Sequence, residues 1–307
     1  MGKVAFMFPG QGSQEVGMGA AFAAASPAAR ATFDRASAAL GFDVAEVCFE
    51  GPMERLSSTE MTQPALTATS LACLAAVEEA GFRADYVIGH SVGEYAALVA
   101  AGVLSVEDAM VLVRERGLAT AEAAAETPGA MAAVIGLADE QVEELCAGIE
   151  GVWPANYNCP GQLVVSGTEA GVAALLEAAQ AAGARRALRL NVSGGFHSPL
   201  TASAERRLRP ALEAATFHDP STTFFSTVTC RVEDRADAMV DILVEQLVAP
   251  VKFTQAVTEL AGLGVTQFVE VGSGSVLSGL VKRIDRSAQA ISVSSPDGLA
   301  KLEAARV

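Results

Sequence analysis

The sequence predicts an α/β fold in which helices cover both faces of a parallel sheet. Two short apolar runs, residues 4–8 and 86–88, each precede a glycine-containing turn, and helix-like sequence follows both turns. Strands that alternate with helices in this way are typical of a parallel sheet. Apolar residues make up 51% of the 307 residues and aromatic residues only 6%. This composition excludes a disordered chain and favours closely packed helices over an all-β sandwich.

The first part of the chain is predicted to run through buried strands, turns and helices in regular succession. Ser105 and Asp108 have the spacing of a capping box and mark the start of one of these helices. The predicted segments, in order, are strand 4–8, turn 9–13, helix-rich sequence to about residue 80, strand 86–88, turn 89–93, helix 94–101 and a helix from 105 toward 125.

After residue 129 the pattern changes to β-α-β-β-α-β, the order of a ferredoxin-like unit. We therefore predict a small inserted subdomain over residues 126–193, with residues 1–125 and 194–307 forming the core. A further strand, 268–271, precedes the turn at 272–274. The segments of the subdomain are strand 131–137, helix 139–149, strand 153–158, strand 162–166, helix 170–182 and strand 186–192.

Charge and cysteine content exclude several classes of function. The chain holds 21 Lys and Arg against 36 Asp and Glu, a net charge of −15, so it is expected to be a poor binder of nucleic acid. Its five cysteines are scattered without a CxxC motif, which argues against a zinc site or a disulfide framework. No apolar stretch reaches the roughly 18 residues that span a bilayer. We expect a cytoplasmic protein without a metal.

The most informative motif is Gly-x-Ser-x-Gly at residues 89–93, between a predicted buried strand and an apolar helix. This is the pattern of a nucleophile elbow, in which a tight turn presents the serine hydroxyl clear of the backbone. The N-terminus of the following helix stabilises developing negative charge. We therefore predict that Ser91 is a nucleophile. The alternative is a plain strand-to-helix turn with a capping serine.

A serine nucleophile needs a general base, and the chain offers only three histidines. His90 adjoins Ser91 within the turn, so its side chain is expected to point away, and His218 lies in a polar turn. His197 follows two glycines that allow close approach of the backbone, and it is the predicted base. No aspartate or glutamate stands in an obvious loop to orient it, so a backbone carbonyl is the expected acceptor.

Two glycine-rich turns do not fit a nucleotide-binding motif. Gly10-x-Gly12 would need a further glycine where Glu15 stands, and the P-loop spacing places Met18 where a lysine is required. Gln11, in the turn after the first strand, presents an amide N–H that suits an oxyanion. An ordinary turn is the alternative at this position.

Taken together, the ordered motifs resemble the malonyl-CoA:acyl-carrier-protein transacylases, and the similarity covers essentially the whole chain. No single motif is decisive, but the set is specific. The motifs are FPGQGSQ at 8–14, TQPAL at 62–66, GHSVGEY at 89–95, Arg116-Gly117, NCPGQ at 158–162, Phe196-His197 and EVGSG at 270–274.

The resemblance implies a hydrolase-like α/β core with the active site between it and the small subdomain. Ser91 would take the malonyl group from coenzyme A, and the thiol of acyl carrier protein would then accept it. The backbone N–H groups of Val92 and Gln11 would form the oxyanion hole. The family orients its histidine through a main-chain carbonyl in a segment resembling residues 249–252, which implies an orienting backbone at Lys252.

The resemblance also implies that Arg116 holds the free carboxylate of malonate, because a guanidinium matches a carboxylate with two parallel N–H donors. Helical periodicity does not choose between Arg116 and Arg114, since both have apolar neighbours; only the Arg-Gly match selects Arg116. Gln63 and Asn158 match positions that line the acyl or pantetheine pocket. Phe196 resembles the residue of malonyl-selective members.

An acidic carrier protein should be repelled by a chain of this charge unless positive charge is localised. Two candidate docking patches are Arg185, Arg186 and Arg189 in the small subdomain, and Lys282, Arg283 and Arg286 after the turn at 272–274. Their adjacent pairs, Arg185-Arg186 and Lys282-Arg283, are called the first and the second basic cluster below. Ordinary solvated faces are the alternative for both.

Three other functions remain open at this point. A serine esterase or thioesterase would explain Ser91 and His197 but gives no reason for Arg116. A transacylase for another acyl unit, serving a polyketide pathway, and a scaffold without catalysis are the others. Coenzyme A enters as a thioester substrate, and no cofactor is expected.

Overall fold

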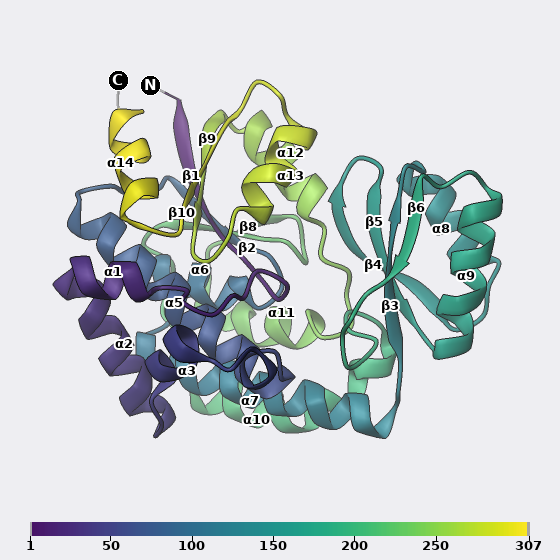
Figure 1. The fold of residues 1–307 in the computed structure, drawn as a ribbon, viewed down its shortest axis with the longest axis horizontal. Coiled ribbons are helices and arrows are strands. Elements are labelled where there is room, and N and C mark those ends of the chain that lie inside the picture. Colours follow the sequence, from purple (N-terminus) through teal and green to yellow (C-terminus); the bar gives the residue numbers. More distant parts are fainter. Residues whose placement is uncertain (1, 306–307) are drawn as a thin grey trace.

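The computed structural model describes residues 2–305. It has a large α/β body and a smaller sheet with its own two helices, which projects from one side of the body (Figure 1). The long helix α7 (Val106–Glu126) runs along the body and leads into the first strand of the smaller sheet, β3 (Ala130–Ile135) (Figure 1). At its start, Ser105 Oγ accepts from the Asp108 amide at 2.9 Å and donates to the Asp108 carboxylate at 2.7 Å.

The sheet of the body has six strands in the order β10-β9-β1-β2-β7-β8. All neighbouring pairs are parallel except β7 and β8, which form an antiparallel hairpin. This confirms the parallel sheet predicted from sequence. The strands are β1 (Lys3–Phe8), β2 (Tyr86–Gly89), β7 (Thr223–Ser226), β8 (Arg231–Glu233), β9 (Val265–Val271) and β10 (Gln289–Val293).

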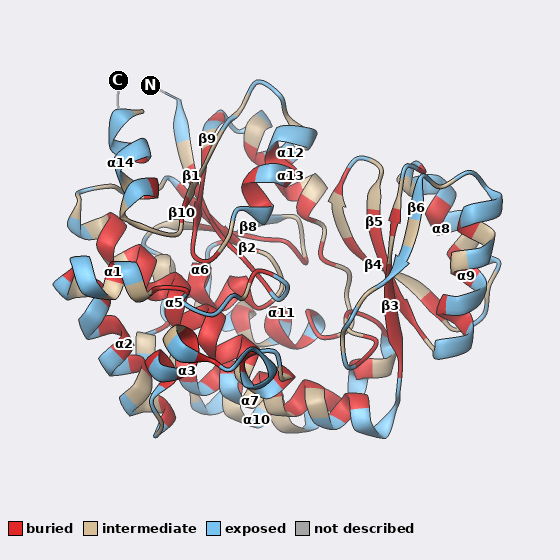
Figure 2. Ribbon diagram, in the orientation of Figure 1, coloured by how far each residue is buried: buried red, intermediate tan, exposed pale blue. Residues whose placement is uncertain are grey.

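Alternate side chains of β1 enter two different cores, as the twofold period of a strand requires. Phe6 and Phe8 join the larger cluster, which is built with helices such as α2 and α5. Ala5 and Met7 join a second cluster, built with α12 and α13. Both faces of the strand are therefore buried, which explains why residues 4–8 are apolar without interruption (Figure 2).

Helices pack on both sides of this sheet and account for most of the body (Figure 1). Besides α7 they are α1 (Ala20–Ala25), α2 (Pro27–Leu40), α3 (Val44–Glu50), α4 (Met53–Leu56), α5 (Thr59–Glu79), α6 (Gly93–Ala100), α10 (Glu205–Ala214), α11 (Met239–Glu245), α12 (Phe253–Gly262), α13 (Val276–Ile284) and α14 (Pro296–Ala304), with short 3₁₀ turns at Pro199–Ala204 and Ala236–Ala238.

The smaller sheet has four antiparallel strands in the order β4-β5-β3-β6. Its helices pack on one face, where Ala132 and Val134 of β3 contribute to a separate core. Met131, which alternates with them, lies on the opposite face in a small cluster with Phe196. The other elements are α8 (Asp139–Ala147), β4 (Val152–Cys159), β5 (Gln162–Gly167), α9 (Glu169–Ala181) and β6 (Arg186–Arg189), the last ending three residues before its predicted end.

Two further observations bear on the expectations from sequence. All five cysteines are free thiols. No helix within residues 2–305 combines the length and the apolar character needed to cross a membrane.

Candidate active site

Ser91 stands on the turn between β2 and α6 in a left-handed backbone conformation, with φ of 53°. A side chain at Gly89 would overlap the backbone of Glu94, and one at Gly93 would overlap the carbonyl of Phe8. Both glycines of the motif are therefore required by close backbone approach. The strained conformation raises the serine out of the turn, as expected for a nucleophile elbow.

The side chains of Ser91 and His197, 106 positions apart in the chain, meet at this turn. Ser91 Oγ and His197 Nε2 lie 2.8 Å apart. On its other side the ring contacts two backbone carbonyls, with Nδ1 3.0 Å from the Gln246 oxygen and 3.1 Å from the Ala249 oxygen. Carbonyl oxygens only accept, so Nδ1 carries the proton and Nε2 accepts from the serine. This tautomer is the one that a general base requires.

The expectation that the backbone of Lys252 orients His197 is wrong, because the two carbonyls that contact Nδ1 belong to Gln246 and Ala249. The Lys252 carbonyl instead accepts from the Ala256 amide in the first turn of α12, and its amide donates to Thr227. Its ammonium group donates to the Val228 carbonyl at 3.2 Å. The acceptors lie three and six residues earlier, where the chain leaves α11 and turns toward Pro250.

Burial, followed by the positive charge of Arg116 and the neighbouring His90, lowers the pKa of His197 to about 3. The two carbonyl contacts act in the opposite direction but are smaller in effect. His197 is therefore neutral at physiological pH and ready to accept a proton. Its own backbone is also left-handed, with φ of 58°.

Arg116 points into the same site from α7 and is only 4% exposed. Its Nη1 donates to Gln63 Oε1 at 2.7 Å, and its Nη2 donates to Gln246 Oε1 at 3.0 Å and to Ser91 Oγ at 3.2 Å. Its Nε has no hydrogen-bond partner in the described part of the chain. Among residues 2–305 no carboxylate forms an ion pair with it. A buried guanidinium held only by neutral groups is a site prepared for an anion.

The tertiary structure separates the two arginines that periodicity left equivalent. Arg114 is exposed, where it donates to the Leu40 carbonyl at 2.9 Å and lies over the ring of Phe42. Gln63 is fixed beside Arg116 because its Nε2 donates to Thr120 Oγ1 at 3.2 Å, which leaves its oxygen for the guanidinium.

The turn that carries Gln11 is pressed against the elbow. A side chain at Gly10 would meet the His90 carbonyl, so glycine permits this approach. Ser13 Oγ donates to the Gly10 carbonyl at 2.8 Å, and Ser273 Oγ donates to the Ser13 carbonyl at 2.7 Å. The GSG segment near the C-terminus thus braces this turn. Within the described chain, no acceptor satisfies the backbone N–H of Gln11 or Val92.

A cavity of about 290 Å³ opens over these groups, between the body and the smaller sheet. The sequence-predicted residues that line it are Ser91, His197, Arg116, Gln11, Gln63 and Phe196. Met131, Thr120 and Asn156 also line it, although the sequence analysis did not single them out.

Asn158 is placed differently from what the resemblance implied. Its Oδ1 lies 2.9 Å from His90 Nε2, and Asn156, two residues earlier on β4, lines the cavity instead. Burial lowers the pKa of His90, so the ring is a neutral partner of this amide. His218 is exposed and does not line the cavity, and its backbone amide donates to the Val103 carbonyl.

The two basic clusters lie outside the cavity. The first basic cluster is exposed at the start of the edge strand β6, where it lines a separate shallow depression. The second basic cluster is exposed in the last turn of α13, and Arg283 of this cluster donates to Gln162 Oε1 at 2.6 Å. Arg189, at the end of β6 near the first basic cluster, forms an ion pair with Glu169, so its charge is neutralised.

Sequence reasoning missed Gln246, which joins several groups of the site. Its side chain and carbonyl reach Arg116, His197 and the backbone of Ser91. It follows α11 in a stretch without a glycine, a histidine or a motif, so no local signal marked it.

Comparisons with known proteins found a matching family model and relatives of similar length. A model of the acyl transferase domain matches residues 5–301. The malonyl CoA-acyl carrier protein transacylase of Bacillus subtilis is 44% identical over 301 residues, covering 97% of this chain and 95% of that protein. The Escherichia coli K12 protein of the same name is 43% identical over 304 residues, covering 98% of both chains.

Solved structures show the same similarity in three dimensions. The malonyl-CoA:acyl carrier protein transacylase of Xanthomonas oryzae superposes with a TM-score of 0.96 at 43% identity, covering 99% of this chain and 98% of that one. A malonyl-transacylase solved in complex with its type II PKS acyl-carrier protein has a TM-score of 0.94 at 40% identity, covering 97% and 98%.

Proposed function

Because this chain belongs to the acyl transferase domain family, we propose that it transfers the malonyl group from malonyl-CoA to the thiol of acyl carrier protein. The observation that carries this proposal is the buried Arg116 guanidinium, which lacks a carboxylate partner and points Nη2 at the nucleophile Ser91. Malonyl differs from acetyl by one carboxylate. An arginine in this position supplies the partner that the carboxylate needs.

In the first half-reaction, Ser91 Oγ attacks the thioester carbonyl while His197 Nε2 accepts its proton. The two atoms are already at hydrogen-bond distance, 2.8 Å. The oxyanion that forms is stabilised by the unpaired N–H groups of Val92 and Gln11 and by the start of α6. The intermediate collapses to a malonyl ester on Ser91, and His197 returns the proton to the departing thiolate of coenzyme A.

The second half-reaction reverses these steps with a different thiol. The phosphopantetheine thiol of the carrier gives its proton to His197 and attacks the malonyl ester. Ser91 leaves and recovers its proton from the same imidazole. Every step uses side chains and backbone amides of this chain, with coenzyme A as a substrate, so the proposed mechanism requires no cofactor.

Arg116 would hold the malonyl carboxylate throughout both halves. Binding of this anion places a negative charge beside a guanidinium whose pKa is lowered by burial, and so relieves the cost of burying it. Gln63 and Gln246 present their oxygens to the same guanidinium and aim it toward Ser91. Phe196 and Met131 close the apolar side of the cavity and limit the size of the acyl group.

Several finer assignments accompany this proposal. The body corresponds to a hydrolase-like core over residues 1–125 and 194–307. The strand order β4-β5-β3-β6 and the β-α-β-β-α-β succession support a ferredoxin-like subdomain over residues 126–193. We place the enzyme in the cytoplasm because its free thiols suit a reducing compartment. We place it in fatty acid synthesis because of its similarity to the transacylases named above. The two basic clusters are the proposed docking sites for the acidic carrier.

One experiment separates this proposal from its rivals. The protein is mixed with malonyl-CoA and analysed by mass spectrometry, first intact and then after digestion. A malonyl adduct on Ser91 that disappears when the holo carrier protein is added supports transfer. Rapid release of free malonate without a carrier would instead indicate a thioesterase, and an unmodified protein would indicate a scaffold. Adducts of equal yield from acetyl-CoA and malonyl-CoA would refute the malonyl assignment.

A further inference from the structure

Glu94 is a buried carboxylate that the proposed mechanism does not use. It lies in the first turn of α6, three residues after Ser91, and its exposed fraction is 0%. Burial raises its pKa, which four hydrogen-bonding contacts partly offset. A carboxylate in such a place is costly to bury, and a neutral residue would fill the space at less cost. This cost points to a role for the carboxylate.

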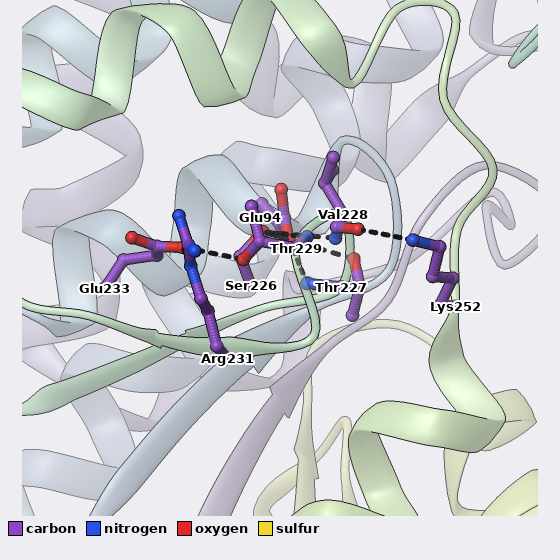
Figure 3. Close-up of polar contacts among 8 residues, drawn as sticks. All are labelled: Glu94, Ser226, Thr227, Val228, Thr229, Arg231, Glu233 and Lys252. Carbon is purple, nitrogen blue, oxygen red and sulfur yellow. Dashed lines mark hydrogen bonds and ion pairs between the residues drawn. The ribbon is translucent and has the colours of Figure 1, made fainter.

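One oxygen of Glu94 is held by the hairpin turn between β7 and β8. Its Oε1 accepts from the Thr227 amide at 2.6 Å, from Thr227 Oγ1 at 2.9 Å and from Ser226 Oγ at 3.2 Å (Figure 3). Lys252 braces the same turn through the Val228 carbonyl (Figure 3). The carboxylate is therefore fixed in orientation by backbone and hydroxyl donors.

The other oxygen of Glu94 faces the catalytic groups through Gln246. Gln246 Nε2 donates to Glu94 Oε2 and also to the Ser91 carbonyl, at 3.2 Å for the latter. A carboxylate and a carbonyl can only accept, so the NH₂ end of the Gln246 amide must face them. Its oxygen is then left for Arg116 Nη2, which can only donate, at 3.0 Å.

We propose that Glu94 is a positioning residue whose carboxylate fixes the orientation of the Gln246 amide and, through it, the place of Arg116 beside Ser91. This inference rests on the proposed function, because it explains how the malonyl-binding guanidinium is aimed. A rotated Gln246 amide would set its NH₂ group against the guanidinium, donor against donor, and would leave its oxygen against the carboxylate. The negative charge three residues from the nucleophile prevents this.

The test uses Glu94→Gln, which keeps the size and shape of the side chain but removes the requirement for a donor at Gln246. Acyl-enzyme formation is measured with malonyl-CoA and with acetyl-CoA on the full-length protein. We expect kcat/KM for malonyl-CoA to fall about 10- to 100-fold, because a small misplacement of a binding group has effects of this order. The fall for acetyl-CoA should be smaller, so the malonyl-to-acetyl ratio decreases.

Glu233→Gln is the matched control from the same hairpin. Glu233 is also a buried carboxylate, and it accepts from Thr229 Oγ1 at 2.7 Å and from Arg231 Nε at 2.8 Å (Figure 3). It forms no hydrogen bond with Gln246. A loss of stability alone would lower kcat/KM for malonyl-CoA and for acetyl-CoA by the same factor in either variant. The ratio should therefore stay at the wild-type value in Glu233→Gln.

A double-mutant cycle with Gln246→Ala tests the connection itself. Gln246→Ala keeps the backbone carbonyl that orients His197 but removes the amide, so it should lower the malonyl-to-acetyl ratio by itself. If Glu94 acts through this amide, adding Glu94→Gln should change the ratio less than twofold further. Fully multiplicative effects would overturn the proposal.

The outcomes distinguish this inference from the function on which it rests. Wild-type protein that forms no malonyl adduct on Ser91 would overturn both. A normal wild type with an unchanged ratio in Glu94→Gln would overturn only the role of Glu94. Folding of Glu94→Gln is checked by thermal denaturation and circular dichroism. If this variant does not fold, Gln246→Ala is the deciding variant: a lowered malonyl-to-acetyl ratio supports the proposal, and an unchanged ratio refutes it.

Discussion

Replacing Arg116 by alanine is the most direct test of malonyl specificity. The guanidinium is almost completely buried, and its partners are the neutral side chains of Gln63, Gln246 and Ser91. In the proposed complex, the malonyl carboxylate would be the charged partner that this guanidinium lacks among residues 2–305. Arg116→Ala would leave that carboxylate buried and unpaired.

The expected magnitude follows from this geometry. Removing one member of a buried ion pair costs about 3–5 kcal/mol. At about 1.4 kcal/mol per tenfold, Arg116→Ala should lower kcat/KM for malonyl-CoA by roughly 10²- to 10³-fold or more. Acetyl-CoA carries no carboxylate, so its rate should be unchanged or higher. Arg116→Lys should restore only part of the malonyl rate, because an ammonium cannot form two parallel hydrogen bonds to a carboxylate.

The assay compares acyl-enzyme formation from the two thioesters by rapid quench and intact mass. Arg114→Ala is the matched control, since it comes from the same helix but is exposed and contacts only a carbonyl and the Phe42 ring. Arg114→Ala should change kcat/KM only slightly for both malonyl-CoA and acetyl-CoA. If Arg116→Ala lowered malonyl and acetyl transfer equally, the guanidinium would be structural and the malonyl assignment would lose its main support.

Three further predictions follow from the site and its surroundings. Ser91→Ala should fold normally and form no acyl-enzyme by mass spectrometry; a malonyl label on another residue would contradict the elbow assignment. Because the pKa of His197 is lowered to about 3, kcat/KM for malonyl-CoA should stay flat from about pH 8 to pH 6, with no fall near the ordinary histidine pKa of about 6.5. As pH falls, the unfolded chain binds the proton of His197 before the folded chain does. The contribution of His197 to the free energy of unfolding, measured with denaturant, is therefore lost as pH falls from about 6.5 toward 3. His197→Ala should remove this pH dependence and lower the rate of transfer about 10²- to 10⁴-fold. Reversing either basic cluster to glutamate should raise KM for the carrier but not slow the first acylation, and added salt should weaken transfer; transfer that is independent of salt would argue against electrostatic docking.

Local patterns were sufficient to predict the strands at 4–8 and 86–88, the elements of the smaller sheet and the tight turn at Ser91. The apolar run at 4–8 has both faces buried, and the glycines around Ser91 are required where strand and helix pass in contact. The contacts themselves are tertiary, but the apolar run and the glycine spacing are patterns of neighbouring residues, so they are visible in one dimension. The β-α-β-β-α-β succession was likewise predicted, because each of its strands and helices has its own apolar period.

Only the tertiary structure decided which side chains share the site. It turned Arg116 inward and Arg114 outward, on a helix whose periodicity favoured neither. It supplied the orienting carbonyls from Gln246 and Ala249 in place of Lys252, and it set Asn156 in the cavity where Asn158 was expected.

The physical reason is that these contacts join segments about 50 to 155 positions apart in the chain. Gln246 illustrates this most clearly, because an amide has no local pattern and takes its role only from Glu94, Arg116 and Ser91 around it. The sequence by itself determined that Ser91 would stand on a tight turn between a strand and a helix, and it indicated His197 as the partner of the serine. The packing of α7 and of the segment after α11 against that turn decided how the serine, the histidine and the arginine are held together.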